Sequence, residues 1–369
     1  MTVKELELTS YRNIPYAKIP LKDGINFFLG DNAQGKTNAL EAIYLFARGK
    51  SFRGALDAQI VPFEGDFYSV RLSFRRADRD EELFYSFSKE GRVRKRNGIL
   101  LEKQSDMIGS FRAVLFSPEH LQMVKGSPHE RRQFLNVAIS QCYPVYLSLY
   151  SRYDKLLSHR NACLKDLQRG KEGADRSMLR VFSEQLASLA SEIFLYRRDY
   201  VSRLYESASR FLTDISDGKE RLTLAYESDI DSLPSQTQGE AEESYKMVFL
   251  SSLEREIAFG SSLFGVQRDD LSIRINGKSA REYGSQGQQR SVVLALKMAE
   301  GEISRILSGD EPVYLFDDVL SELDEDRRAY LLSGMRHKQL IVTGCEKGIL
   351  GESTEDVHFI HVKDGAFSE

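Results

Sequence analysis

One short stretch restricts the fold of this chain more than any other. Residues 25–29 read INFFL and pass directly into GDNAQGKT at residues 30–37, after which NALEAI opens an amphipathic segment. A strand, a GxxxxGK[ST] loop and a helix in this order form a phosphate-binding loop, because the glycines let backbone N–H groups turn toward phosphate oxygens. The alternative is a plain glycine turn before a helix that carries a solvated lysine. The flanking patterns favour a nucleotide-binding α/β domain.

The loop would supply three kinds of contact to a nucleotide. The helix that follows it presents a positive N-terminal end. Lys36 brings a point charge to the β and γ phosphates, and the Thr37 hydroxyl is a ligand for Mg²⁺. The predicted cofactors are therefore ATP and Mg²⁺, and Lys36 is also a predicted catalytic residue. The nucleotide-binding residues predicted in the loop are Gly30, Asp31, Asn32, Ala33, Gln34, Gly35, Lys36 and Thr37.

A second element would hold the metal. Residues 313–316 read VYLF and lead into Asp317 and Asp318. Buried strands rarely end in adjacent acids unless a cation or a water molecule needs them. We expect Asp317 to bind Mg²⁺ through water and Asp318 to polarise the attacking water as a general base. The alternative, a solvated strand end, loses weight because a phosphate loop lies in the same chain.

A third motif, YGSQGQQRS at residues 283–291, precedes a predicted helix that starts at about Gly287. Ser285 as the N-cap would expose backbone N–H groups at a second anion-binding helix start. One nucleotide already has the phosphate loop, so this second start is expected to meet the γ-phosphate bound by another subunit. Ser285 is therefore a predicted catalytic residue. The further nucleotide contacts predicted here are Gln286, Gly287 and Gln288.

Composition limits the remaining possibilities. The 369 residues, 41% hydrophobic and 29% charged, indicate a soluble protein with two or three subdomains. No apolar run approaches the roughly 20 residues that span a bilayer, and the start MTVKELELTS shows no secretory signal. Cys142, Cys163 and Cys345 are far apart and suggest reduced thiols rather than a metal site. We expect a cytoplasmic protein. Because the net charge is −4, DNA would have to meet local basic patches.

The order of predicted elements suggests one α/β domain interrupted by helices. Alternating or apolar segments predict strands, and Asn97-Gly98 predicts a type I′ hairpin turn. From about Pro128 the apolar period becomes helical in two stretches, 134–157 and 178–215, with GKEG between them. These stretches predict an antiparallel helical hairpin, which is either an arm that contacts a partner or a lobe that only packs on the sheet domain. The predicted strands are 3–8, 25–29, 70–74, 83–87, 92–96, 99–101, 271–275, 313–316, 340–343 and 357–362.

The α/β domain is therefore predicted to be split in sequence. Residues 1–112 and 264–369 would form the domain that binds the nucleotide. Residues 113–263 would form the inserted helical lobe. The polar stretch 228–243 is expected to be a loop.

Residues 283–291 resemble the signature motif of the ABC ATPases, in the SxGQ form of SMC-type proteins. The order of phosphate loop, signature and acidic strand is that of this superfamily, so the resemblance implies an ABC-type ATPase head with mixed β-sheets. Ser321 and Asp324, within SELD, resemble the D-loop that couples two sites across a dimer. Transporter members carry a histidine after the next strand. Here residues 340–345 read LIVTGC, and Thr343 is the candidate for its place.

Other stretches resemble the RecF family of bacterial recombination mediators over nearly the whole chain. They are LELTSYRN at residues 6–13, the phosphate loop with NALEAIY after it, FSPE at 116–119, and KGSP at 125–128 with Arg131-Arg132. The resemblance implies a head-to-tail homodimer that closes on ATP and holds gapped DNA where duplex meets single strand. It also implies RecR as a partner, RecO and RecA as indirect partners in RecA loading, and weak DNA-stimulated ATP hydrolysis that resets the clamp. By analogy, Arg12 and Asn13 line the nucleotide.

Two runs depart from that family. Its usual GPHRDD reads GVQRDD at residues 265–270, and its usual KSHR reads KSFR at residues 50–53. Two histidines are thus replaced by Gln267 and Phe52, so no role is assigned to either position.

The basic residues suggest where DNA would bind. Arg92, Arg94, Lys95 and Arg96 form the densest cluster, and strand alternation would place three arginines on one face as a phosphate ladder. Arg131 and Arg132 are further candidates, on a helix. For each cluster the alternative is a solvated face paired with nearby acids. No base-reading motif occurs, so we expect contacts to the DNA backbone and shape rather than to sequence.

Three functions remain open at this point. The first is a DNA-responsive ATPase with two ATP molecules between subunits. The second is a switch in which ATP acts as an assembly ligand and hydrolysis is incidental, favoured by the short Asp318 where many relatives use glutamate. The third is an ABC-type subunit coupled to a transporter or to a different protein scaffold.

Overall fold

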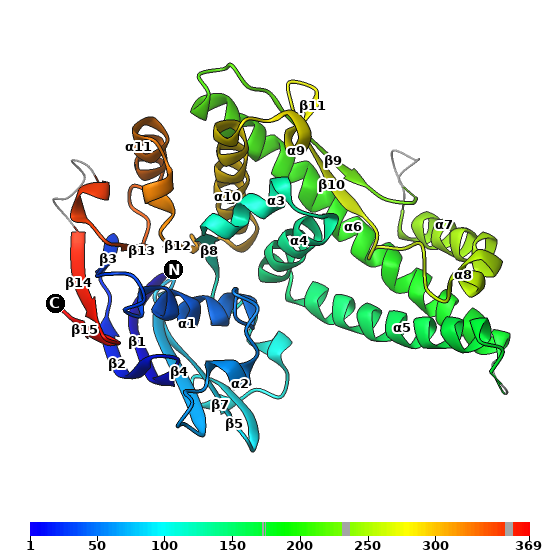
Figure 1. The fold of residues 1–369 in the computed structure, drawn as a ribbon, viewed down its shortest axis with the longest axis horizontal. Coiled ribbons are helices and arrows are strands. Elements are labelled where there is room, and N and C mark those ends of the chain that lie inside the picture. The colour runs from blue at the N-terminus through cyan, green and yellow to red at the C-terminus, as the bar shows by residue number, and fades with distance from the viewer. Residues whose placement is uncertain (172, 174, 231–236, 351–356) are drawn as a thin grey trace. The chain divides into compact units, whose positions relative to one another are not determined.

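The computed structural model describes residues 1–369 except 172, 174, 231–236 and 351–356. The described chain divides into two compact units (Figure 1). Unit 1 comprises Met1–Leu121, Asp214–Gly218 and Arg290–Glu369. Unit 2 comprises Gln122–Thr213 and Lys219–Gln289. None of the helices in this described part is long and apolar enough to cross a membrane.

The first sheet of unit 1 is mostly parallel, with the strand order β15-β14-β3-β13-β12-β8. Only β15 runs antiparallel to its neighbour. Strands β8, β12 and β13 are buried throughout, as expected for a parallel sheet covered on both faces. The strands are β3 (Ile25–Leu29), β8 (Ala113–Phe116), β12 (Val313–Phe316), β13 (Leu340–Gly344), β14 (Val357–Lys363) and β15 (Ala366–Ser368).

The second sheet of unit 1 is antiparallel, with the order β2-β1-β4-β5-β6-β7. Helix α1 (Lys36–Arg48) contacts strands of both sheets, and its buried apolar residues contribute to the core between them. Asn97 and Gly98 both have positive φ, which confirms the predicted type I′ turn. The strands are β1 (Thr2–Tyr11), β2 (Ile14–Pro20), β4 (Phe67–Arg76), β5 (Arg79–Ser88), β6 (Gly91–Arg96) and β7 (Ile99–Leu100).

Helices and short turns complete unit 1. Helix α10 begins in unit 2, and all of it from Arg290 onward belongs to unit 1. These elements are α2 (Asp57–Ile60), α10 (Gln286–Ser308), α11 (Glu325–Gly334) and the 3₁₀ turns η1 (Gln104–Asp106), η2 (Pro118–Leu121), η3 (Val319–Glu322) and η4 (Lys347–Leu350).

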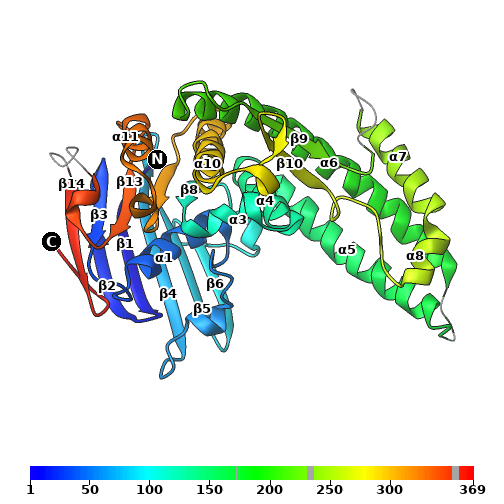
Figure 2. The ribbon, with the colours of Figure 1, turned by 45° about the horizontal axis from the view of Figure 1, so that its top comes forward.

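Unit 2 is built on two long helices, α5 (Pro144–Gln168) and α6 (Arg176–Ile215), which form the predicted hairpin (Figure 2). Helix α8 packs against α5, and β10 pairs with both β9 and β11 in a small sheet. The other elements are α3 (Gln122–Lys125), α4 (Pro128–Cys142), α7 (Gln238–Ser251), α8 (Leu253–Phe259), α9 (Ala280–Tyr283), β9 (Leu222–Glu227), β10 (Asp270–Ile275) and β11 (Lys278–Ser279).

Two local predictions in unit 2 were wrong. The helical stretch 134–157 is broken at Tyr143, whose backbone (φ −128°, ψ 88°) is not helical, because Pro144 disfavours helical geometry in the preceding residue. Residues 228–243 were expected to be a loop, yet α7 begins at Gln238. Thr237 caps this helix and exchanges hydrogen bonds with Glu240, a capping box that the polar composition obscured. Residues 231–236 of that stretch lie outside the described residues.

The compact units also divide the chain at other positions than the predicted domains did. Strand β8 follows residue 112, yet it pairs with β12 and so belongs to unit 1. Strand β10 follows residue 263, yet it pairs with β9 and so belongs to unit 2. Strand pairing over a long sequence distance therefore shifts both boundaries.

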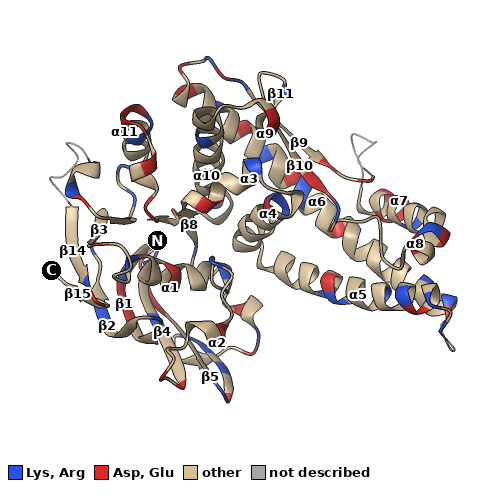
Figure 3. Ribbon diagram, in the orientation of Figure 1, with Lys and Arg blue, Asp and Glu red and all other residues tan. Residues whose placement is uncertain are grey.

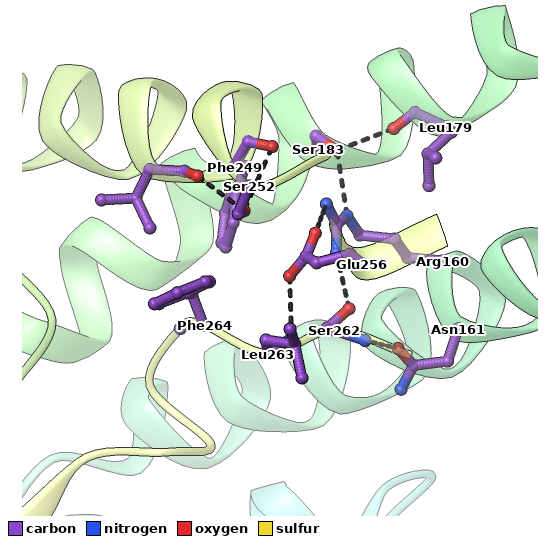
Figure 4. Close-up of polar contacts among 12 residues, drawn as sticks. Arg160, Asn161, Leu179, Ser183, Phe249, Ser252, Glu256, Ser262, Leu263 and Phe264 are labelled. Carbon is purple, nitrogen blue, oxygen red and sulfur yellow. Dashed lines mark hydrogen bonds and ion pairs between the residues drawn. The ribbon is translucent and has the colours of Figure 1, made fainter. Parts of the chain in front are cut away.

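A buried ion pair joins α5 to α8 (Figure 4). The Arg160 guanidinium of α5 donates to Glu256 of α8 at 2.6 Å, and neither side chain is exposed. Arg160 also donates to Ser183 of α6 and to Ser262, and it stacks over the Phe249 ring. Every guanidinium nitrogen therefore has a partner, as a buried charge requires.

Candidate nucleotide-binding site

A cleft of about 610 Å³ lies beside the phosphate loop, within unit 1. Its walls come from the phosphate loop, the end of β1, the end of β12 and the turn after β8. The residues that line it are Arg12, Asn13, Asn32, Ala33, Gln34, Gly35, Lys36, Thr37, Asn38, Phe52, Arg53, Ser117, Pro118, Glu119, Asp317 and Asp318. The structure thus brings together most of the predicted site residues of this unit. Six residues line the cleft without having been predicted to bind nucleotide: Asn38, Phe52, Arg53, Ser117, Pro118 and Glu119.

The loop geometry follows from its glycines. Gly35 has φ 116°, a conformation that other residues rarely adopt, and it lies directly before α1. A Cβ atom at Gly30 would collide with the carbonyl oxygen of Val362 on β14. The Lys36 ammonium donates to the carbonyl oxygens of Gly30 and Asp31, the latter at 2.9 Å. The loop therefore wraps around the Lys36 ammonium and leads directly into the start of α1.

The two predicted metal-binding residues lie against each other. The Thr37 hydroxyl donates to Asp317 Oδ1 at 2.7 Å, although 280 residues separate them. Burial raises the pKa of the Asp317 carboxyl, and the Asp318 charge adds to this. Hydrogen bonds from Thr37 and Thr343 oppose the shift. One carboxylate beside one hydroxyl next to the phosphate loop fits Mg²⁺, which takes its other ligands from phosphate and water.

The described residues contain no group of three or more His, Cys, Asp or Glu that could hold a metal ion.

Arg12 and Asn13, which the resemblance placed at the nucleotide, both line the cleft. Asn13 accepts a hydrogen bond from Asn38 at 2.7 Å and donates weakly to Ala33 O. Arg12, however, directs its guanidinium at Glu41 of α1 with contacts of 2.5 and 2.7 Å. Glu41 is fully buried and had not been predicted as a site residue, because an acid inside an amphipathic helix carries no local signal. Arg12 and Glu41 together fix the end of β1 to α1.

The signature segment lies at the start of α10, in unit 2. Ser285 N donates to Gln288 Oε1 at 2.9 Å, and Gln288 N donates to Ser285 Oγ at 3.2 Å. This reciprocal pair confirms that Ser285 caps the helix. Ser285 and Gln286 are exposed, whereas Gly287 and Gln288 are half-buried. The capped, exposed helix start suits an anion brought by another molecule.

The segment after the acidic strand is also ordered by its own side chains. Ser321 Oγ donates to the Asp318 carbonyl at 2.7 Å, and Asp324 caps α11 through Arg327 N. Both residues are exposed.

Comparison with known proteins decides the family. A family model described as the RecF/RecN/SMC N terminal domain matches residues 2–368. The DNA replication and repair protein RecF of Shouchella clausii (strain KSM-K16) is 38% identical over 359 residues, which are 96% of each chain. The protein of the same name from Bacillus subtilis (strain 168) is 37% identical and covers 99% of each chain. The chain belongs to the RecF family.

Solved structures agree with this assignment. The recombination mediator protein RecF with ATP, of the RecFOR pathway, matches with TM-score 0.91 and 34% identity, over 100% of this chain and 97% of that one. The SMC head bound to the C-winged helix domain of ScpA matches with TM-score 0.56 and 16% identity, over 100% and 96% of the chains, which speaks for the fold alone. The predicted fold class, a split ABC-type head with an inserted helical lobe, is therefore confirmed.

The basic candidates for DNA contact in this RecF family member fall into two places. Arg92 and Arg94 of β6 lie over the rings of Phe87 and Tyr85, each at 5.6 Å. Arg92 also contacts Asp57 at 2.7 Å. Acidic and basic residues are interspersed along the ribbon in both units (Figure 3).

The remaining candidates are also engaged by neighbours. Lys95 lies 5.9 Å from the Phe84 ring, and Arg96 contacts Glu81. In unit 2, Arg131 is 8% exposed and makes two hydrogen bonds to Asp270, while Arg132 donates to Asp269 O at 2.8 Å. The β-hairpin of β6 and β7 in unit 1 is thus the more accessible of the two candidate DNA-binding regions.

The unusual GVQRDD run has a structural part in unit 2. The Asp269 carboxylate accepts one hydrogen bond from the Tyr226 hydroxyl and lies 3.5 Å from the buried Arg197 guanidinium. Gln267, at the position of the family histidine, accepts a hydrogen bond from Tyr153. The second departure, Phe52, lies 6.1 Å from the Tyr44 ring, at the cleft in unit 1.

Proposed function

We propose that this chain is an ATP-dependent DNA-binding protein of recombinational gap repair. The observation that carries the proposal is the nucleotide cleft, where Lys36, Thr37 and Asp317 converge in one unit. Membership in the RecF family supports the rest. Its curated relatives are named for DNA replication and repair, and its solved relatives for recombination mediation with ATP.

The ATP site would be completed by a second copy of the chain. Lys36, Thr37 and Asp317 of one subunit would hold the triphosphate and Mg²⁺, and Ser285 of the other would meet the γ-phosphate. Support comes from the exposed, capped start of α10. Two such sites in a head-to-tail dimer would be related by a twofold axis. Asp318 would act as the general base in a slow hydrolysis that resets the dimer, and Ser321 and Asp324 would couple the two sites.

The closed dimer would hold DNA at duplex and single-strand junctions without sequence preference. The exposed arginine of β6, Arg92, and its neighbours offer backbone contacts. By analogy with the RecFOR relatives, RecR would be the direct partner, with RecO and RecA acting downstream. ATP hydrolysis would be weak and stimulated by DNA.

The test is the fluorescence anisotropy of a labelled gapped duplex titrated with the protein without nucleotide, with ADP and with ATP. Wild type should bind tightly only with ATP, and Ser285→Arg should lose that binding. Ser202→Arg is the matched control, because it adds the same charge at an exposed position of α6 in the same unit. Binding that ignores ATP would leave the RecF fold without the proposed function and would favour a different scaffold as its partner.

A further inference from the structure

The end of strand β13 carries a hydroxyl that contacts both acidic residues of the site. Thr343 Oγ1 lies 3.2 Å from Asp317 Oδ1 and 3.3 Å from Asp318 Oδ1. It also accepts a hydrogen bond from the Asp318 backbone N–H at 2.9 Å. Thr343 is 2% exposed and does not line the nucleotide cleft. The side chain therefore reaches the nucleotide only through the two carboxylates.

The Thr343 hydroxyl can donate only one hydrogen bond, which limits its possible partners. A threonine hydroxyl has one proton and two lone pairs. One lone pair takes the N–H of Asp318, so the proton is left for a carboxylate or for the Phe316 carbonyl at 3.4 Å. A charged acceptor makes the stronger hydrogen bond, which favours Asp317 or Asp318. One group thus bridges the metal-binding acid and the candidate general base.

The backbone of Asp318 needs such support. Its φ is 50° and its ψ is 11°, in the left-handed region that residues other than glycine adopt infrequently. This turn redirects the chain at the end of β12, and the Thr343 hydroxyl accepts the N–H at the turn. Valine at position 343 would have nearly the same shape but no acceptor, so the Asp318 N–H would lose its partner.

The same strand end also contacts the phosphate loop. Gly30 N donates to Gly344 O at 3.3 Å, and the Cys345 thiol donates to Asn32 Oδ1 at 3.3 Å. Residues 343–345 thus fix the loop and the acidic pair relative to each other. This segment stands where transporter-type relatives carry a histidine that contacts the nucleotide.

We propose that Thr343 is a positioning residue for ATP hydrolysis, whose hydroxyl holds the Asp318 backbone and orients the carboxylates of Asp317 and Asp318. It acts on the acidic pair and not on the γ-phosphate. The inference rests on the proposed ATPase function, and it adds a residue to which that function assigns no part.

Two pairs of variants isolate the hydroxyl. Wild type and Thr343→Val differ in the hydroxyl at nearly constant shape. Thr343→Ser and Thr343→Ala both lack the methyl group of threonine and differ from each other only in the hydroxyl. Thr223→Val, on the exposed face of β9 in unit 2, is the matched control. Steady-state ATPase rates with DNA give kcat and KM, and binding of fluorescent ATP with Mg²⁺ gives affinity. Thermal melting checks each fold, and the Ser and Ala pair decides the question if the Val variant does not fold.

We expect Thr343→Val and Thr343→Ala to lower kcat about tenfold or more, since each loses a hydrogen bond to a charged group. KM and ATP affinity should change by less than about threefold, because no contact to the nucleotide is lost. Thr343→Ser should recover most of the rate. If wild type hydrolyses ATP but the Thr343→Ser and Thr343→Ala variants have equal kcat, the positioning role of Thr343 is overturned while the proposed function stands. A wild type that neither binds nor hydrolyses ATP would instead overturn the proposed function.

Discussion

At the scale of single residues, Lys36 shows how the phosphate loop prepares for its ligand. Lys36 is 3% exposed, and its ammonium donates to the carbonyl oxygens of Gly30 and Asp31. A buried ammonium with only neutral partners gains from an anion. A triphosphate placed over the loop amides would supply that anion. The lysine is thus fixed in position before the nucleotide arrives.

Lys36→Met is expected to weaken ATP binding by about tenfold or more, since a charge-assisted contact to phosphate is lost. Isothermal titration calorimetry with ATP and Mg²⁺ measures this directly. Lys18→Met serves as control, because the Lys18 side chain is 56% exposed on β2. An unchanged ATP affinity for Lys36→Met would remove the loop from the nucleotide site.

The residues of the site differ in how far sequence could identify them. Lys36, Thr37 and Asp317 were predictable because each stands in a short motif with fixed spacing to a strand or helix. Glu41 and Thr343 were not identified as partners of Arg12 and of the acidic pair. Their roles depend on contacts between segments that only the fold brings together, such as β13 and β12.

At the scale of elements, the Arg160 and Glu256 pair fastens α5 to α8 within unit 2. Arg160→Met should lower the free energy of unfolding by about 3–5 kcal/mol, because it leaves the Glu256 charge buried without a counterion. Adding Glu256→Gln should recover much of this, since the amide still accepts from Leu263 N. Urea unfolding of the two variants gives both values.

Arg180→Met is the control for the pair, because Arg180 is 79% exposed and lies 3.5 Å from Glu184 on the same helix. Its effect should stay below about 1 kcal/mol. A similarly small decrease in the free energy of unfolding for Arg160→Met would mean that the buried pair between α5 and α8 contributes little to stability.

Asp269 gives unit 2 a defined pH dependence. Burial raises its pKa to about 6, against the nearby charge of Arg197. The folded state therefore binds a proton more tightly than the unfolded state, and stability falls as pH rises from about 4 to about 6. In Asp269→Asn this part of the pH dependence should disappear, because the amide does not titrate in this range. Denaturation midpoints of both proteins at pH 4.5, 5.5 and 7 measure it, and parallel profiles would contradict the assignment.

Elements were predictable where their signals were local. Strand β3 and strand β12 occupy the predicted residues, since an uninterrupted apolar run before a motif leaves little choice. The break at Tyr143 and the start of α7 were missed, because apolar periodicity ignores Pro144 and polar composition hides the capping of Thr237. Strand pairing over long sequence distances, as between β8 and β12, leaves no mark in either segment alone.

At the scale of the whole molecule, the chain carries two helix starts suited to anions, one in each unit. The first follows Gly35 in unit 1, and the second is capped by Ser285 in unit 2. A second copy would let the exposed start of one chain complete the cleft of the other. ATP would then act as part of the interface, so assembly would depend on its concentration.

Sedimentation velocity of wild type and Ser285→Arg, each without nucleotide and with saturating ATP and Mg²⁺, tests this account most directly. Wild type should shift from monomer to dimer with ATP. Ser285→Arg should stay monomeric although its own cleft binds ATP with an affinity close to that of wild type, because an arginine at the capped helix start blocks the partner's γ-phosphate. A Ser285→Arg protein that dimerises with ATP as readily as wild type, or a wild type that remains monomeric, would contradict the shared nucleotide site.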